Sequence, residues 1–204
     1  MDIIGICDHN TAENVAATTA VGRRLGVTVV GGMEITSREV VHVLGLFSNT
    51  EGLHATQEAV YAHLEGENDP DFFGTQWVMD DQDRVTAENG RLLIGATDLS
   101  LSEIVDLIHG HGGASIASHI DRPSFSVISQ LGFIPTDLDL DGVEMCSPGE
   151  TPPTGGLPVV HSSDAHSLED VGIRFTRLFI EEPTPAEVVL AIRGVAGRKI
   201  LEDE

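Results

Sequence analysis

The sequence contains few aromatic residues, few cysteines and no long hydrophobic run. Aromatic residues make up 4% of the 204 residues, so the core must consist mainly of aliphatic side chains. Cys7 and Cys146 are the two cysteines, which is typical of a reducing compartment, and we expect both to be free thiols in or near strands. No apolar stretch approaches the roughly 18 residues of a membrane-spanning helix, and no signal peptide precedes the first apolar run. These features predict a single cytoplasmic domain over residues 1–204.

Positive charge is scarce in this chain. Lys199 is the single lysine, and the formal net charge is -22 at pH 7. A surface this acidic repels phosphate backbones and anionic lipids, which argues against a nucleic-acid polymer or a membrane as the partner. A small phosphorylated substrate is still compatible with this charge, provided that an arginine or a bound metal ion supplies a local positive site.

A glycine-rich phosphate loop is also lacking. Gly110-His111-Gly112-Gly113 follows a predicted helix rather than a strand, which argues against a nucleotide-binding Rossmann domain. Strand patterns alternate with helical patterns, and this order predicts an α/β fold with a mainly parallel sheet, either a barrel or a doubly wound sheet. The expected strands lie near 3–7, 27–35, 40–47, 114–118, 143–145, 157–161 and 174–180, and the expected helices lie over 12–25, 50–66, 101–111 and 184–195. The segment 67–100 departs from the alternation, and we expect an excursion with short helices there.

The sequence does contain metal-binding side chains at the ends of its apolar runs. These side chains are Asp8-His9, Glu34, His119 and Asp164-Ala165-His166. Barrel enzymes built from β/α units place their chemistry at the C-terminal ends of strands, and carboxylates combined with imidazoles suit Zn²⁺, Mn²⁺ or Fe²⁺. Asp164 and His166 are two residues apart, so that on an extended strand end both would face the same side. The pattern predicts a metal site that collects residues from distant parts of the chain.

The remaining histidines are weaker candidates. His42 lies in an apolar strand, where a neutral core histidine is the usual interpretation, but its closeness in the chain to Glu34 favours metal binding. His109 and His111 have the spacing of ligands on a strand, but they belong to a predicted helix end, where this spacing turns them about 200° apart. We therefore expect no shared metal ion at this pair.

The ordered set of motifs resembles the polymerase and histidinol phosphatase (PHP) superfamily. The motifs are Ile6-Cys7-Asp8-His9-Asn10, Gly32-Met33-Glu34-Ile35, Val41-His42-Val43-Leu44-Gly45, Gly112-Gly113 through Ser118-His119, and Ser163-Asp164-Ala165-His166. Each motif alone is weakly specific, whereas the set spans about residues 2–195 in the family's order. The resemblance implies a distorted (β/α)7 barrel that holds two or three Zn, Mn or Fe ions. It also implies an enzyme that hydrolyses a small phosphate ester, either a phosphomonoester or a nucleotide.

The resemblance also implies which residues would hold the metal ions. The implied ligands are His9 and His166 for one ion, Glu34, His42 and His119 for a second, and Glu34 and Asp164 for the remaining one. Asp8 would support the ligands without binding an ion itself. A carboxylate has two oxygen atoms, so Glu34 could bridge two of the ions.

Catalysis and substrate binding would fall to residues of the same cluster. Asp164 or His166 would help to protonate the leaving alkoxide. Arg122 follows His119 closely in the chain, and its guanidinium group would clamp the phosphate through two hydrogen bonds. The alternative for Arg122 is an ordinary surface ion pair with Asp121 or another carboxylate.

The family's first motif, a His-x-His at the end of the first strand, has no counterpart in this sequence. Met1-Asp2-Ile3 leads directly into what resembles the family's second strand. A barrel without its first strand exposes sheet edges, over which the chain could oligomerise. Three interpretations follow: an incomplete chain of an active phosphoesterase, a short, catalytically impaired form with a metal-binding or regulatory role, or a short form completed by a partner chain.

Overall fold

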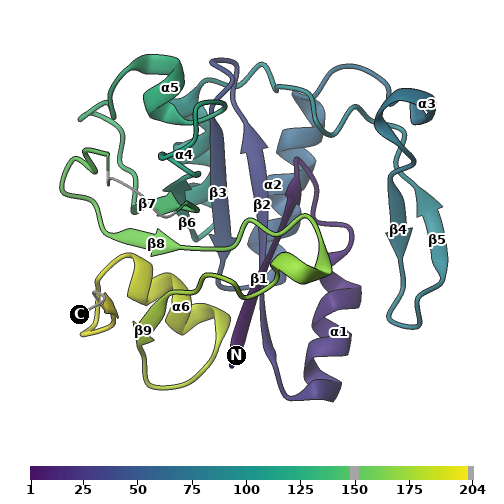
Figure 1. The fold of residues 1–204 in the computed structure, drawn as a ribbon. Helices are drawn as coiled ribbons and strands as arrows, with labels where there is room; N and C mark the ends of the chain where they lie inside the picture. Colours follow the sequence, from purple (N-terminus) through teal and green to yellow (C-terminus); the bar gives the residue numbers. More distant parts are fainter. Residues whose placement is uncertain (148–151, 202–204) are drawn as a thin grey trace.

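A computed structural model describes residues 1–147 and 152–201 of the chain (Figure 1). The main element is a curled, mixed sheet of six strands in the order β1-β2-β3-β6-β7-β8. These strands are β1 Ile3–His9, β2 Thr28–Thr36, β3 His42–Phe47, β6 Gly113–Ala117, β7 Gly142–Met145 and β8 Val159–His161. The structure therefore has the α/β fold that the alternation of strand and helix patterns predicts.

All strands of this sheet except β3 run in the same direction. β1 is parallel to β2, β6 to β7 and β7 to β8, whereas β3 is antiparallel to both of its neighbours. β3 is reversed because only residues 37–41 separate it from β2, and a parallel pair needs a crossover of about a dozen residues or more. As a consequence, the C-terminal ends of the parallel strands lie at the same edge of the sheet as the first residue of β3.

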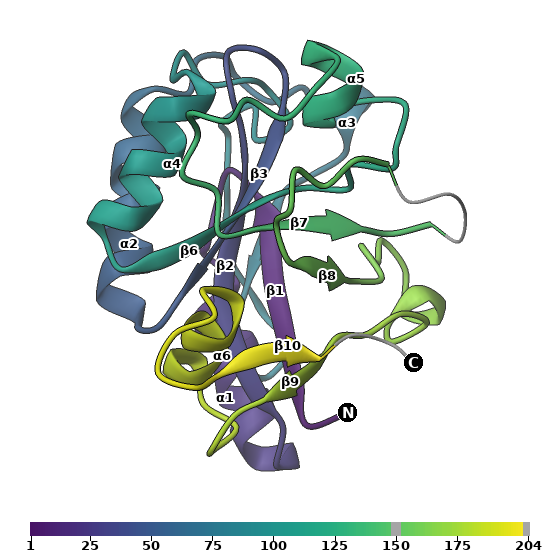
Figure 2. The ribbon, with the colours of Figure 1, turned by 90° about the vertical axis from the view of Figure 1, so that its left-hand side faces the viewer.

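Helices cover the two faces of the sheet differently. The outer face packs on α1 Val15–Leu25, α2 Thr50–Ala62 and α4 Leu101–Gly110, and Figure 2 shows α2 and α4 together on this side. The inner face packs on α6 Pro185–Ile192 through an apolar cluster formed by Val30, Ala114, Ile116, Val188, Val189 and Ile192. Because successive side chains of a strand alternate between the faces, β2 directs Val30 to this inner cluster and Met33 and Ile35 to the core on the outer face.

The helix ends follow local sequence signals. α1 ends at Gly26, whose positive φ of 73° suits a residue without a side chain, and α4 begins at Ser100, which forms a capping box with Glu103. Three predicted helix boundaries are wrong by three or four residues. α1 begins only at Val15 instead of residue 12, α2 ends at Ala62 instead of residue 66, and α6 ends at Ile192 instead of residue 195.

The excursion at 67–100 is built around a hairpin and contains one short helix. The helix is α3 Pro70–Phe73, and the hairpin pairs β4 Trp77–Met79 with β5 Val85–Glu88. The prediction of short helices is therefore wrong for most of this segment. The acidic stretch after Met79 forms the turn of the hairpin, where the Asp80 carboxylate accepts hydrogen bonds from the backbone N–H groups of Gln82 and Arg84.

The remaining elements lie in the C-terminal half of the chain. They are α5 Val127–Leu131, the 3₁₀ turn Leu168–Asp170, β9 Arg177–Phe179 and β10 Lys199–Leu201. The strand expected at 174–180 is shorter than predicted and pairs with β10 in a separate two-stranded sheet. Within 1–147 and 152–201, no helix has both the length and the apolar character needed to span a bilayer.

Asn10 ties the excursion to the edge of the main sheet. Its side chain is buried, and its Nδ2 donates hydrogen bonds of 2.8 Å to the carbonyl oxygens of Leu93 and Gly95. Its Oδ1 accepts a hydrogen bond of 3.1 Å from the backbone N–H of Thr36. Asn10 also has a positive φ of 50°, a conformation that asparagine tolerates better than most residues. One side chain thus fixes the excursion against the ends of β1 and β2.

We predict that Asn10→Ala lowers the free energy of unfolding by about 2–4 kcal/mol, because it leaves buried backbone groups without partners. The matched control is Asn49→Ala, which removes the exposed N-terminal cap of α2 and should cost about 1 kcal/mol. Urea denaturation followed by circular dichroism measures both. Equal losses for the two variants would contradict the role of Asn10.

Candidate metal centre

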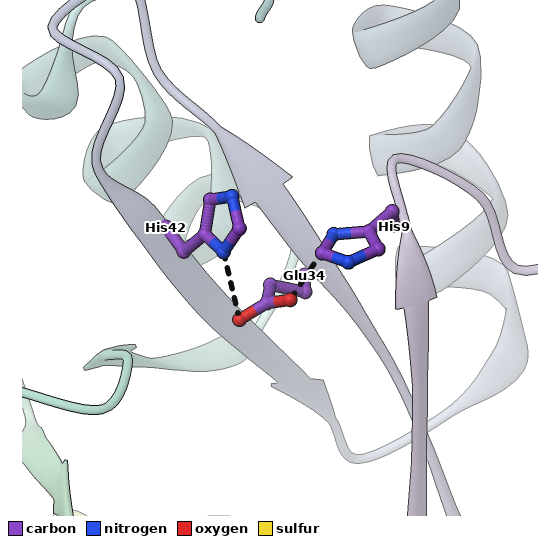
Figure 3. Close-up of side chains that lie close together, drawn as sticks. All are labelled: His9, Glu34 and His42. Atoms are coloured by element: carbon purple, nitrogen blue, oxygen red, sulfur yellow. Dashed lines mark ion pairs between the residues drawn. The ribbon is translucent and has the colours of Figure 1, made fainter. Parts of the chain in front are cut away.

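Strand alternation brings three candidate ligands to the inner face of the sheet. β2 directs Val30 toward α6, and with a period of two residues Glu34 faces the same side. The same alternation places His9, at the end of β1, and His42, at the start of β3, on this face. Because β3 is antiparallel to β2, its first residue lies at the edge where β1 and β2 end (Figure 3).

The Glu34 carboxylate lies at the centre of this group. Its Oε2 lies 3.1 Å from Nδ1 of His9, and its Oε1 lies 3.3 Å from Nδ1 of His42 and 3.4 Å from Nε2 of His119. One ligand atom each from His9, Glu34 and His42 lies within 4.8 Å of the others. Two ligands bound at about 2.0–2.2 Å to one tetrahedral ion lie about 3.4 Å apart, so these spacings fit a metal ion.

Unpaired ring nitrogens support the same interpretation. Nδ1 of His9, Nε2 of His42 and Nδ1 of His119 are buried and have no hydrogen-bond partner within the described residues. Nδ1 of His9 is close to Glu34 but lacks the geometry of a hydrogen bond. The unpaired nitrogen of His9 is also the one that faces Glu34, whereas those of His42 and His119 are the ring atoms that do not face it. Burying a polar nitrogen without a partner is unfavourable, and a divalent cation between His9 and Glu34 would relieve that cost. The donor set therefore fits Zn²⁺, Mn²⁺ or Fe²⁺.

The electrostatics of the cluster keep Glu34 charged. Burial by itself raises the pKa of the Glu34 carboxyl, but its contacts with His119 and His42 outweigh burial and hold the pKa well below its ordinary value. For His9, burial lowers the imidazole pKa and outweighs the opposing effect of Glu34. An ionised carboxylate beside a neutral imidazole is the protonation state in which both groups can bind a cation.

A buried glutamate that the motif analysis missed holds His119 in place. His119 lies just beyond β6 with a φ of 31°, and its backbone N–H donates a hydrogen bond of 3.0 Å to Oε2 of Glu144 in β7. The other oxygen of Glu144 accepts a hydrogen bond from Ser162, and burial raises the pKa of this carboxyl. The signal for Glu144 was present in the sequence as a charged residue inside the apolar strand Val143-Glu144-Met145.

Asp164, His166 and Arg122 line the same cavity as the histidines, a space of about 220 Å³. Asp164 and His166 do not share a strand end as predicted, because β8 ends at His161 and Asp164 has a left-handed φ of 43°. This turn still leaves both residues on the cavity wall. The Arg122 guanidinium forms an ion pair with Asp164 on the cavity wall, so its partner is a carboxylate other than Asp121.

Two further residues adjoin the cluster. Phe125 stacks on the His42 ring, with centroids 4.6 Å apart and planes 20° apart, and its carbonyl oxygen accepts the His42 backbone N–H. No sequence pattern marks Phe125. Asp8 lines a second, neighbouring cavity, and burial raises the pKa of its carboxyl.

Other candidate side chains lie outside this cluster. Nε2 of His109 lies 2.8 Å from Asp141, whereas Nδ1 of His111 lies 3.0 Å from the Thr56 hydroxyl, so the two histidines contact different partners. Cys7 and Cys146 are free thiols, as expected; Cys146 is buried and Cys7 is half-buried.

Residues 154–195 match a family described as PHP-associated. No curated protein matches the sequence. Among solved structures, the lesion-specific endonuclease from Pyrococcus furiosus is similar with a TM-score of 0.65 and 18% identity, covering 98% of this chain and 49% of that chain.

Two other solved structures share the fold. Endonuclease Q in complex with a 27-mer duplex substrate carrying an abasic lesion has a TM-score of 0.62 and 17% identity, covering 98% of this chain and 50% of that chain. A candidate metal-dependent phosphoesterase from Bifidobacterium adolescentis has a TM-score of 0.54 and 16% identity, covering 94% of this chain and 86% of that chain. The chain spans about half the length of the two endonuclease chains, and at these identities the likeness shows a shared fold.

We predict that the protein binds a divalent transition metal and that Glu34→Gln weakens this binding at least about tenfold. The change replaces one carboxylate oxygen of the cluster with an amide NH2 group and removes the negative charge. Glu58→Gln, an exposed change on α2, is the matched control and should leave affinity unchanged. Competition against a chromogenic chelator measures the affinity. If both variants bind metal as tightly as the unmodified protein, the cluster is not the metal site.

Proposed function

We propose that the chain belongs to the PHP superfamily and that it is a metal-dependent phosphoesterase that hydrolyses a small phosphate ester. The observation that carries this proposal is the meeting of Glu34 with three histidines beside Arg122 and Asp164 in one cavity. Phosphoester hydrolysis needs an activated water and positive charge around the phosphoryl group, and these residues fit both needs. The curled six-stranded sheet supports the finer proposal of a distorted (β/α)7 barrel of the PHP type formed as a single domain.

Two or three Zn, Mn or Fe ions are proposed for this site. Divalent ions supply a water of lowered pKa and neutralise phosphoryl oxygens when they are bound. The two oxygens of Glu34 face different histidines, Oε2 toward His9 and Oε1 toward His42 and His119, which supports a bridging role. We propose His166 and Asp164 as the further ligands, since both line the same cavity.

Arg122, Asp164 and His166 are proposed to act on the substrate. The Arg122 guanidinium is rigid and always charged, so it can hold a phosphate through paired hydrogen bonds. In the structure it pairs with Asp164, which positions it on the wall of the metal cavity. Asp164 or His166 would carry the proton that the leaving alkoxide takes up.

The substrate is proposed to be small, and a nucleic acid is the competing candidate. The net charge of -22 opposes binding of a polyanion. Two structures with the same fold are described as endonucleases, one with a duplex bound, which favours testing a nucleic acid directly. Incubation with duplex DNA containing an abasic lesion at moderate salt, followed by gel analysis, separates the two. Cleavage would replace the small ester with a nucleic-acid substrate.

We predict that the metal-loaded protein hydrolyses p-nitrophenyl phosphate and that Asp164→Asn lowers kcat by about 10²–10⁴-fold, because the change removes a carboxylate from the reaction site. Asp106→Asn, on the exposed side of α4, is the matched control and should leave kcat unchanged. Metal uptake without any turnover by the unmodified protein would favour the metal-binding or regulatory alternative instead.

We also predict that Arg122→Met raises the KM for p-nitrophenyl phosphate roughly tenfold or more, because the phosphate loses a charged hydrogen-bond donor. Arg122→Lys should recover only part of this loss, since an ammonium group cannot form the paired contact. Arg84→Met, at the exposed hairpin turn, serves as the control. An unchanged KM in Arg122→Met would show that Arg122 does not contact the phosphate.

A further inference from the structure

A second cavity of about 230 Å³ adjoins the metal cavity and has no role in the proposed function so far. It lies between the β4–β5 hairpin, which stands apart from the main sheet in Figure 1, and the segment that joins the C-terminal end of β1 to the N-terminal end of α1. His9 and Ile94 line both cavities and so form a shared wall. A phosphate ester bound in the metal cavity could therefore extend its leaving group past these residues into the second cavity.

The amide donors around this second cavity are already engaged within the protein. Both hydrogens of the Gln76 amide are donated, to the carbonyl oxygens of Asn89 and Arg91 at 2.8 and 2.7 Å. The Asn89 amide donates to Glu13 and to the Tyr61 hydroxyl, each at 2.9 Å. An amide that has used its N–H groups can offer only its oxygen to a ligand.

Asn14, at the start of α1, also spends hydrogen bonds within the protein. Its amide donates to the Trp77 carbonyl oxygen at 3.2 Å, and its Oδ1 accepts from the Met79 N–H at 2.9 Å. The polar wall of the cavity is consequently rich in acceptor oxygens, including the carboxylates of Asp8 and Glu13. Such a wall favours a ligand with many hydroxyl or amino hydrogens and repels a second phosphate.

The remaining wall is apolar and partly open to solvent. It contains Trp77, which is 50% exposed, together with Val78, Leu93 and Ile94. An indole next to hydrogen-bond acceptors suits a ring with an apolar face and hydroxyl groups at its edge. The volume is below the roughly 300–1,000 Å³ of pockets for drug-sized ligands, so it matches a single ring.

We propose that the second cavity binds the sugar ring of a phosphorylated sugar whose phosphate is hydrolysed in the metal cavity. This inference rests on the proposed function and narrows its substrate class to esters whose leaving group is a hydroxyl-bearing ring. Such a ring occurs both in free hexose phosphates and in the ribose of nucleotides. The chemistry of recognition is the same in the two cases, and the test below separates them.

The single tryptophan of the chain, Trp77, makes binding measurable without catalysis. The metal-loaded protein is titrated with glucose 1-phosphate, ribose 5-phosphate and propyl phosphate while intrinsic fluorescence is recorded. We expect a saturable change with at least one sugar phosphate and none with propyl phosphate, which lacks the ring. A response only to ribose 5-phosphate assigns the ring to a ribose. Equal responses to all three, or no response to any, would overturn the proposal.

Variant kinetics test the same cavity independently. Glu13→Gln keeps an oxygen that can accept from Asn89 but removes a carboxylate, and Trp77→Ala removes the indole. Each should raise the KM for the preferred sugar phosphate roughly tenfold while leaving the KM for propyl phosphate, which has no ring to place in the second cavity, unchanged. Phe73→Ala, which is also 50% exposed on the excursion, is the matched control for Trp77.

The two proposals fail in different ways. If p-nitrophenyl phosphate is not hydrolysed, the proposed phosphoesterase function fails, while the fluorescence titration still reports on the cavity. If p-nitrophenyl phosphate is hydrolysed but Glu13→Gln and Trp77→Ala change no sugar-phosphate KM, the function stands and the sugar-ring site is wrong. Circular dichroism of each variant confirms that the comparison is between folded proteins.

Discussion

The contact between the Glu34 carboxylate and its surrounding histidines is the constraint on which the site depends. A buried carboxylate is costly unless it is paired, and Glu34 is 5% exposed. His9 and His42 approach it from the strands on either side, and His119 approaches it from the loop after β6. Their contacts more than offset the effect of burial on the Glu34 pKa. The sheet order β1-β2-β3-β6 is what allows these residues to meet.

Strained backbone surrounds this cluster. Asn10, His119, Phe125 and Asp164 all have positive φ values without being glycine. Such conformations cost free energy and persist where neighbouring contacts hold them, often at functional sites. Here the contacts are identifiable: the Asn10 amide bonds, the Glu144 bond to the His119 N–H and the Arg122 pair with Asp164. The loops at this edge of the sheet are therefore held in place by specific polar interactions.

The distribution of charge and the excursion at 67–100 both bear on which phosphate ester the cluster could bind under the proposed function. Arg122 provides positive charge in the metal cavity, whereas Asp8 and Glu13 place negative charge in the neighbouring one. A substrate with one phosphate and an uncharged, hydroxyl-bearing remainder satisfies both environments. The excursion forms one wall of the second cavity, and hydrogen bonds from Asn10 and Asn14 hold it against β1 and α1.

Much of the fold and the identity of the cluster could be predicted from the sequence, because both depend on local patterns. Short apolar runs mark β1, β2 and β6, and His9, Glu34 and His119 stand in or just beyond these strands. The register of β3 and the turn at Asp164 could not be predicted, because they depend on pairings between distant segments. The same is true of the hairpin at Trp77–Glu88, whose strands are short and exposed and carry a weak periodic signal.

The sequence by itself determined which residue types are available for metal chemistry and the order in which the strands supply them. Only the tertiary structure decided that His42 faces Glu34, that Glu144 holds His119, and that Trp77 lines a cavity next to His9. The physical reason is that ligand geometry and cavity shape require atoms to converge from segments tens of residues apart. Periodicity reports which face a side chain occupies, whereas convergence follows from strand order, chain reversal at β3 and the side-chain bonds that hold the loops.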